Sequence, residues 1–287
     1  MINRLAIIGV GLIGGSLARA LKAAKACNEI VGCARDAAQL QKAVALGVID
    51  RYETDLARAV AGADMIVLAV PPGATREVLR RIASNISAQA VITDAGSAKQ
   101  SVIEDARAVF HSVPRNFVPG HPIAGTERSG VEASFATLFK NQRVILTPLA
   151  ETSPEALAQV RAMWQSAGAA VSEMSAKQHD EILAVTSHLP HVLAYALMDN
   201  LARLDAGNGG EILKNAAGGL RDFTRIAASD PAMWRDICLA NREALLDALQ
   251  NYQQELERIA AAISTNDGAA LTAIFTRAKR ARDERYP

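Results

Sequence analysis

A histidine at position 121 is the first candidate for acid–base chemistry. It stands in Pro119-Gly-His-Pro-Ile-Ala-Gly-Thr-Glu127, where prolines and glycines predict a rigid loop and a carboxylate follows. Histidine changes charge near neutral pH, so it suits general base catalysis. A lone loop histidine is more often simply solvated, and this segment alone therefore leaves both interpretations open.

A second polar segment, Asp94-Ala-Gly-Ser-Ala-Lys99, follows an apolar run at 90–93 that reads as a strand. In open α/β sheets ligands bind at the carboxyl ends of the strands. Ser97 is therefore placed to meet a ligand. The alternative is that its hydroxyl only caps the helix that follows.

A third segment, Ser187-His-Leu-Pro-His191, is expected to begin a helix. Its histidines, His188 and His191, are three residues apart and so share a helix face. Zinc binding would need further ligands, and the sequence offers no obvious ones, so we expect no metal. Pocket-lining side chains or a simple helix cap are the favoured interpretations.

The pattern Gly9-Val-Gly11-Leu-Ile-Gly14 predicts a dinucleotide site. It directly follows an apolar strand, 5–8, and opens a helix expected at 13–21, which is the context that this motif requires. Gly9 permits the tight turn, Gly11 lets the backbone approach a pyrophosphate, and Gly14 lets helix and strand pack closely. The phosphates would then lie at the helix N-terminus.

The end of the second predicted strand bears on the choice between NAD and NADP. An NAD site usually has an acidic residue there, but this chain has Ala34 followed by Arg35. A small residue leaves room for a 2′-phosphate and a guanidinium can bind it, which favours NADP. Asp36 keeps NAD open if the register differs by two, and Arg35 could be an ordinary solvated side chain.

The elements that must position these residues follow two sequence patterns, one in each part of the chain. Strand-like runs at 5–8, 30–33, 65–70, 90–93 and 144–146 alternate with helical patterns, which predicts a parallel sheet of α/β type. From about Ser175 the patterns are helical only, with one long amphipathic stretch at 234–262 and glycine breaks at 207–210 and 217–219. We therefore expect a Rossmann-type domain at 1–174 and an all-α substrate and dimerisation domain at 175–287. A monomeric mass in light scattering would contradict the expected homodimer.

Composition excludes several other classes. Half of the 287 residues are hydrophobic, the net charge is +1 and only 4% are aromatic, which argues against disorder and against nucleic-acid partners. No uncharged apolar run is long enough to span a membrane. Three cysteines without CxxC spacing indicate a reduced, cytoplasmic protein.

Taken together, the motifs resemble the prephenate/arogenate (cyclohexadienyl) dehydrogenase family of tyrosine biosynthesis. The resemblance covers nearly the whole chain, and its most specific parts are the segment 120–127 followed by the segment 187–191. Further matching segments are 9–15, 94–99, 222–227 and 229–237.

The resemblance implies an oxidative decarboxylation of a cyclohexadienol that bears a ring carboxylate. His121 matches the family's catalytic histidine, and Ser97 matches the serine that bonds this histidine and the substrate hydroxyl. Arg225 matches the substrate-binding arginine, and its apolar neighbours predict partial burial. The other residues expected at the substrate are Thr126, Glu127, Ser187, His191 and Trp234. The expected cofactor contacts are Gly9, Gly11, Leu12, Ile13, Gly14, Ala34, Arg35, Val70, Pro71 and Ser97.

Several alternatives remain open at this point. Glu127 and His191 favour prephenate as substrate, with arogenate as a second possibility, and tyrosine is a possible feedback ligand at the active site. A dehydrogenase of the 3-hydroxyisobutyrate or 6-phosphogluconate type would carry a catalytic lysine on the first long helix of the helical domain. Residues 180–195 contain none. A non-catalytic NADP(H)-binding sensor would need the glycine motif but not His121, Ser97 and Arg225 together.

Overall fold

The first part of the chain forms a six-stranded parallel sheet. The computed structural model describes residues 1–126, 128–207 and 209–285. The strands are β1 (Ile2–Ile8), β2 (Cys27–Cys33), β3 (Arg51–Glu53), β4 (Met65–Leu68), β5 (Val91–Asp94) and β6 (Phe117–Val118). Their order, β3-β2-β1-β4-β5-β6, reverses direction between β1 and β4. That strand order is typical of dinucleotide-binding folds, and it confirms the predicted α/β architecture.

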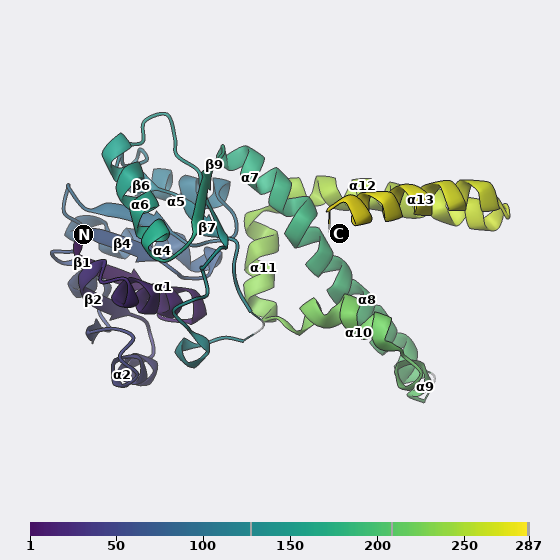
Figure 1. The fold of residues 1–287 in the computed structure, drawn as a ribbon, viewed down its shortest axis with the longest axis horizontal. Helices are drawn as coiled ribbons and strands as arrows, with labels where there is room; N and C mark the ends of the chain where they lie inside the picture. The colour runs from purple at the N-terminus through teal and green to yellow at the C-terminus, as the bar shows by residue number, and fades with distance from the viewer. Residues whose placement is uncertain (127, 208, 286–287) are drawn as a thin grey trace. The chain divides into compact units, whose positions relative to one another are not determined.

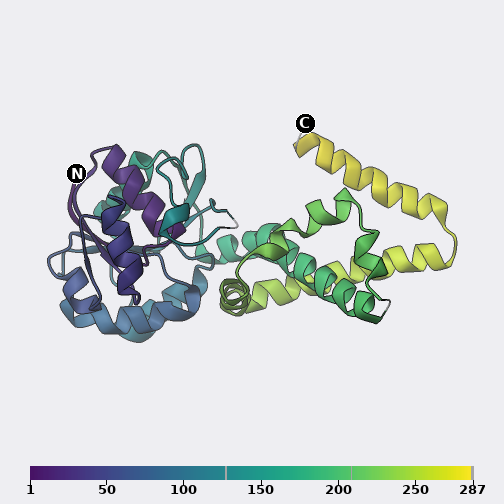
Figure 2. The same ribbon diagram turned by 90° about the horizontal axis from the view of Figure 1, so that it is seen from below.

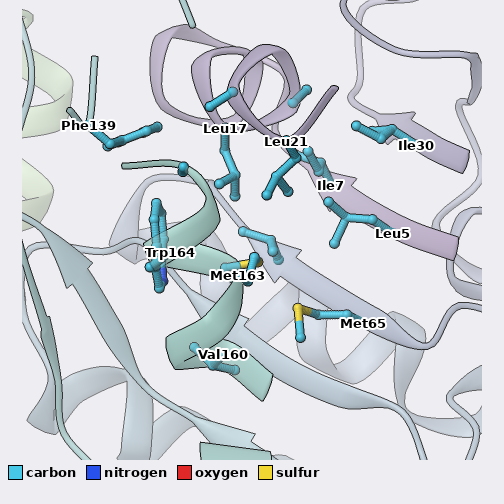
Figure 3. Packing of buried hydrophobic residues seen from close by; sticks show 14 of the residues in the cluster. Leu5, Ile7, Leu17, Leu21, Ile30, Met65, Phe139, Val160, Met163 and Trp164 are labelled. Carbon is cyan, nitrogen blue, oxygen red and sulfur yellow. The ribbon is translucent and has the colours of Figure 1, made fainter. Parts of the chain in front are cut away.

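Both faces of this sheet are buried because its strands are apolar on both sides. Leu5 and Ile7 of β1 enter one core cluster, whereas Ala6 and Ile8 enter the other. Successive side chains of a strand point to opposite faces, so a run of apolar residues fills both layers. Figure 3 shows the first cluster, in which Leu17 and Leu21 of the first helix approach Leu5 and Ile7.

Helices cover the sheet on both sides (Figure 2). They are α1 (Leu12–Ala23), α2 (Ala37–Ala45), α3 (Leu56–Val60), α4 (Thr75–Ile82), α5 (Gln100–Phe110) and α6 (Pro154–Ser166), with short 3₁₀ turns η1 (Pro72–Ala74), η2 (Ala83–Asn85) and η3 (Val131–Ala133). Several begin where a short polar side chain accepts a backbone N–H, namely Asp36, Asp55 and Ser153. Such caps satisfy donors that a helix leaves unpaired at its start.

A second, smaller sheet places His121 on a strand. It consists of β7 (Gly120–Pro122), β8 (Arg143–Leu146) and β9 (Ala170–Glu173), with β7 antiparallel to β8 and His121 opposite Ile145. The expected loop is therefore wrong at this point. A three-residue strand containing glycine and proline has no local strand signal, and pairing with β8 determines its conformation.

The helical region begins with α7 (Ala176–Leu183), a π-helical turn η4 (Ala184–His188) and α8 (Leu189–Gly207). These three follow without a break, so the prediction that Ser187 begins a helix is wrong. Pro190 has no N–H to donate to the preceding turn. A widened π turn just before it accommodates this loss, and such turns often occur at functional sites.

The remaining elements (Figure 1) are α9 (Glu211–Lys214), α10 (Gly218–Thr224), η5 (Arg225–Ala228), α11 (Pro231–Ala240), α12 (Arg242–Ser264) and α13 (Gly268–Arg285). The helix expected over 234–262 is thus two helices, separated by Asn241. The Asn241 side chain is buried and bonded to Asp180 and His188, which belong to earlier elements of the chain, and this explains the interruption. None of the described helices is long and apolar enough to cross a membrane.

The chain divides into two compact units, residues 1–242 and residues 243–287. All site residues discussed below belong to the first unit. The second unit contains most of α12 and all of the described part of α13, joined by a turn at Asn266. The domain boundary expected between 174 and 175 stays a prediction.

Candidate active site

The glycine turn after β1 is required by close packing. Gly9 has a φ of +99°, and a Cβ built on it would lie 2.2 Å from the Ala69 carbonyl oxygen. A Cβ on Gly14 would lie 2.1 Å from the Gly9 carbonyl oxygen. Any larger residue at Gly9 or Gly14 would therefore force the backbone apart.

Gly11 differs, because among the described residues no atom other than those of its chain neighbours lies within 4 Å of a Cβ built there. It is the N-cap of α1, which has no side-chain cap and no acidic residue in its first turn; Leu12 and Ile13 follow, half-buried against the core. Uncapped N–H groups at a helix N-terminus bind anions well. The open space and free donors fit the pyrophosphate of a dinucleotide.

The adjacent strand ends complete this face. Val70 follows β4 and lies against Gly9, with its Cγ1 3.3 Å from the built Cβ. Pro71 is exposed at the start of η1. Both lie where the strand order reverses, which is the usual ligand crevice of such sheets.

The three residues that follow β2 and bear on the cofactor differ in whether their side chains already have a role in the fold. Ala34 is half-buried and Arg35 is exposed. Asp36 is already engaged: its Oδ1 accepts the N–H groups of Ala38 and Gln39 at 2.9 and 3.4 Å, as the cap of α2. This role offers no support for Asp36 as a ribose ligand.

A buried ion pair holds the residue before His121. Lys99 Nζ lies 2.5 Å from Asp94 Oδ2, and both side chains are almost fully buried. Lys99 donates to the Gly120 carbonyl at 2.7 Å, while Asp94 Oδ1 accepts the Gly120 N–H at 3.0 Å. The peptide groups on both sides of Gly120 are thereby fixed, which positions β7.

His121 belongs to a chain of buried hydrogen bonds. Its Nδ1 lies 2.9 Å from His179 Nε2, and His179 Nδ1 lies 2.7 Å from Asp180 Oδ1. Asp180 also accepts the N–H groups of Lys99 at 2.7 Å and Gln100 at 2.8 Å. The Asp180 carboxylate of α7 therefore caps α5, and the alternative interpretation, in which Ser97 caps this helix, is wrong. Ser97 is half-buried, and no hydrogen bond of its hydroxyl is found within the described chain.

Asn241 connects this chain to a second group of rings. Its Nδ2 donates to the Asp180 carbonyl at 2.8 Å and to His188 Nδ1 at 3.0 Å. His188 meets Trp234 edge to face with centroids 6.1 Å apart. Trp234 in turn stacks on His191 at 3.6 Å. The structure thus links His121 with His191 and Trp234, which the sequence predicts to belong to one site.

The other residues expected to contact the substrate differ in their exposure and in their contacts. Ser187 accepts the Nδ1–H of His191 through its carbonyl at 2.9 Å. Arg225 is exposed, so the expected partial burial is wrong, although its charge lies near enough to lower the pKa of His191 after the larger effect of burial. Thr126 is exposed and accepts the Arg128 N–H at 3.3 Å. Glu127 lies outside the described residues.

Burial keeps the central histidines neutral. It is the main cause that lowers the pKa values of His121 and His179, with the Lys99 charge adding to both. For His188 the pKa falls to about 4. Uncharged imidazoles are hydrogen-bond acceptors as well as donors, and a neutral His121 is competent to take up a proton.

The sequence interpretation missed His179, Asp180 and Asn241, and gave Lys99 no role. One signal was available: three of the five histidines fall between residues 179 and 191. Histidine is scarce here, and such clustering on one predicted helix indicates a site. Nothing local distinguishes Asn241, whose role depends on contacts with α7 and η4.

Comparisons with known proteins indicate one family over nearly the whole chain. The family model described as the prephenate dehydrogenase nucleotide-binding domain matches residues 17–173, and that described as the prephenate dehydrogenase dimerization domain matches residues 175–277. A cyclohexadienyl dehydrogenase of Zymomonas mobilis is 39% identical over 98% of this chain and 95% of its own length.

Solved structures give the same result. The prephenate dehydrogenase of A. aeolicus, in complex with hydroxyphenyl propionate and NAD⁺, is 35% identical. It has a TM-score of 0.92 over 99% of this chain and 98% of that one. A Synechocystis arogenate dehydrogenase is 29% identical, with a TM-score of 0.81 over 98% of this chain and 99% of that one.

The glycine geometry predicts different failures for two similar substitutions. Gly11→Ala places a methyl group in open space, so we expect an unchanged thermal midpoint and at least about tenfold weaker dinucleotide binding. Gly14→Ala forces a contact with the Gly9 carbonyl, so we expect loss of stability itself. Calorimetry and fluorescence titration with NAD(P)H separate the two. Equal dinucleotide affinity in Gly11→Ala and the unmodified protein would contradict this account of the site.

The lowered pKa of His188 predicts acid sensitivity. Unfolded histidine has a pKa of 6.5 and folded His188 about 4, so the unfolded chain binds more protons between these values and stability falls as the pH falls. From about pH 7 to about pH 5 this contributes a loss of about 2 kcal/mol. His188→Asn keeps an acceptor for Asn241 but does not titrate. Urea unfolding at both pH values should show a loss smaller by about that amount, and equal losses would exclude the assignment.

Proposed function

Because the chain belongs to the prephenate dehydrogenase family, we propose that it oxidatively decarboxylates prephenate to 4-hydroxyphenylpyruvate, with hydride transfer to NAD(P)⁺. The observation that carries this proposal is the buried, neutral His121, held on β7 beside the carboxyl end of β5 with its Nδ1 already bonded. A base of this kind is what oxidation of a hydroxyl-bearing carbon requires.

The proposed reaction balances without a metal ion or net proton release. The substrate carbon that bears the hydroxyl loses hydride, the ring carboxylate leaves as CO₂, and the electrons of the broken C–C bond make the ring aromatic. The bound nicotinamide supplies the hydride acceptor. His121 holds the hydroxyl proton while negative charge develops on that oxygen and returns it to the phenolate that forms.

The residues around His121 each contribute a separate task. The Asp94–Lys99 pair bonds the peptide groups on both sides of Gly120 and so fixes the backbone position of His121, the next residue of β7. Ser97, half-buried on the same sheet edge, is proposed to bond the substrate hydroxyl. The positive charge of Lys99 also helps to keep His121 unprotonated before substrate binds.

The acidic groups of the substrate need counter-charges. We propose Arg225 for a carboxylate, because its guanidinium offers a bidentate fork and its charge acts on His191, the ring that stacks on Trp234. Ser187, Thr126 and Glu127 are proposed to line the side-chain end. An arogenate-preferring enzyme is the alternative, since the Synechocystis relative carries that name. The sensor interpretation has no observation in its favour.

We further propose that NADP is preferred over NAD. Ala34 leaves space beside the ribose position, Arg35 is exposed next to it, and Asp36 already caps α2. The nicotinamide cofactor itself is common to both alternatives.

Two proposals concern assembly and regulation. The apolar side chains exposed on α12 and α13, including Leu246, Ile263 and Phe275, fit a homodimer. A monomeric mass in light scattering at micromolar concentration would contradict this proposal.

Tyrosine, as a product-like ligand, is proposed to inhibit at the active site. An unchanged rate at millimolar tyrosine would contradict that inhibition. We also propose a cytoplasmic location, where the three free cysteines would stay reduced.

Absorbance of reduced nicotinamide tests the reaction directly. Prephenate and arogenate are each assayed with NAD and NADP, and we expect the fastest turnover with prephenate. His121→Asn should lower kcat by about 10²- to 10⁴-fold while dinucleotide affinity is retained. Absence of turnover in all four combinations would overturn the proposed function, and full activity in His121→Asn would overturn the role of the base.

The pH profile provides an independent check on His121. The base works only when unprotonated, and burial lowers its pKa well below 6.5. The acid limb of kcat/KM, which reports the groups of the free protein, should therefore lie below pH 6.5 rather than at it. Measurement of kcat/KM for the substrate from acid to neutral pH decides this, and a limb at or above 6.5 would exclude His121 as the titrating group.

Arg35→Ala tests the cofactor preference. A charged hydrogen bond is worth about 1.5–3 kcal/mol, so kcat/KM for NADP should fall roughly ten- to a hundredfold while the value for NAD stays nearly constant. Arg107→Ala, in the last turn of α5, is the matched control. Equal effects of Arg35→Ala on both cofactors would contradict the 2′-phosphate assignment.

A further inference from the structure

We propose that His179 and Asp180 are positioning residues that fix the tautomer of His121, with the proton on Nδ1 and the lone pair on Nε2. The role of His121 as base rests on the proposed function, whereas the tautomer follows from the hydrogen bonds alone. Neither His179 nor Asp180 is required to touch the substrate.

The direction of each hydrogen bond follows from Asp180. An ionised carboxylate only accepts, so the 2.7 Å contact requires His179 Nδ1 to carry a proton. A neutral imidazole has one N–H, so His179 Nε2 carries a lone pair and accepts. At 2.9 Å it must receive the Nδ1–H of His121. His121 Nε2 is then left as the basic nitrogen.

Asp180 must stay ionised, although it is buried, for these hydrogen bonds to have the directions given above. Burial raises its pKa, but hydrogen bonds from His179 and from the N–H groups of Gln100 and Lys99 lower it further, and the net value is below the ordinary one. The helix α5 is eleven residues long, and the partial positive charge at its N-terminus also favours the ionised form of Asp180. A protonated Asp180 would forfeit one of these three acceptor contacts.

The surrounding charges leave this arrangement intact. The groups that act on His121 are His179, Lys99 and His188, and those that act on His179 are Asp180, Lys99 and Asp94. Lys99 disfavours a second proton on either ring. The two imidazoles are therefore both neutral before reaction, and only the tautomer determined by Asp180 satisfies all their contacts.

The arrangement also keeps the imidazole ring in place. Rings of His121 and His179 meet at 66° with centroids 5.1 Å apart, so the hydrogen bond determines the rotation of His121 about its side-chain bonds. Without an acceptor at Nδ1, the ring could carry its proton on either nitrogen. A fraction of molecules would then present Nε2–H, which cannot take up a proton from a hydroxyl.

The test compares two variants of His179, because substitution of Asp180 would also remove the cap of α5. His179→Gln retains an amide oxygen that can accept from His121 Nδ1. His179→Leu has similar bulk and no acceptor. We expect His179→Leu to lower kcat about 10- to 100-fold, less than loss of the base itself, and His179→Gln to recover most of this. The KM for the dinucleotide should change in neither variant.

Equal losses in the two variants, or losses that follow only their unfolding midpoints, would overturn the proposal in favour of a purely structural role. A spectroscopic measurement does not depend on turnover. In protein labelled with ¹⁵N-histidine, the five side chains are few enough to resolve, and His121 is identified by its absence in His121→Asn. We expect the wild-type His121 signal to show a protonated Nδ1 and an unprotonated Nε2.

The opposite tautomer in the wild-type protein, or an unchanged tautomer in His179→Leu, would overturn the proposal. The result also separates it from the proposed function. If the protein shows the expected tautomer but no turnover of prephenate or arogenate, the reaction assignment fails while the positioning role stands. If it turns over but His121 carries its proton on Nε2, the positioning role fails alone.

Discussion

The site depends on one buried carboxylate that must remain charged. Asp180 is almost inaccessible to water, yet its two oxygens receive three N–H groups from β5–α5 and α7. Leaving such a charge without its partners costs several kcal/mol, on the order of 3–5. The start of α5, the ring of His179 and, through the Asp180 carbonyl, Asn241 are therefore constrained to meet at one place.

A second buried charge pair complements the first from the sheet side. Asp94 ends β5, and its contact with Lys99 brings the lysine under the Gly120 peptide. The polar groups of Gly120 would otherwise be buried and unsatisfied, which is unfavourable. The small sheet and the large sheet are thus joined at the residue before His121. Lys99 takes part in both arrangements, because its side chain bonds Asp94 and the Gly120 carbonyl while its backbone N–H is accepted by the Asp180 carboxylate.

The parts of this architecture that sequence could predict are those with strong local signals. The apolar run of β1 followed by three spaced glycines predicts both the turn and its ligand, because close packing leaves no other residue at Gly9 or Gly14. The expected fold class is confirmed. β7 could not be predicted, since its strand character arises from β8. The break at Asn241 depends on Asp180, 61 residues away, and has no counterpart in local helix propensity. His121 and Ser97 were expected at one site, yet the contact that the structure shows for His121 is with His179. The roles of the expected site residues stay predictions.

The central claim is that His121 Nε2 takes up the substrate hydroxyl proton while Nδ1 stays bonded to His179. A crystal structure of the protein with dinucleotide and hydroxyphenyl propionate, whose phenol oxygen represents the reacting oxygen, measures this most directly. We predict that the phenol oxygen lies within about 2.6–3.2 Å of His121 Nε2, with the Nδ1–His179 contact retained. A phenol oxygen bonded to another side chain, with His121 Nε2 out of hydrogen-bonding range, would contradict the account.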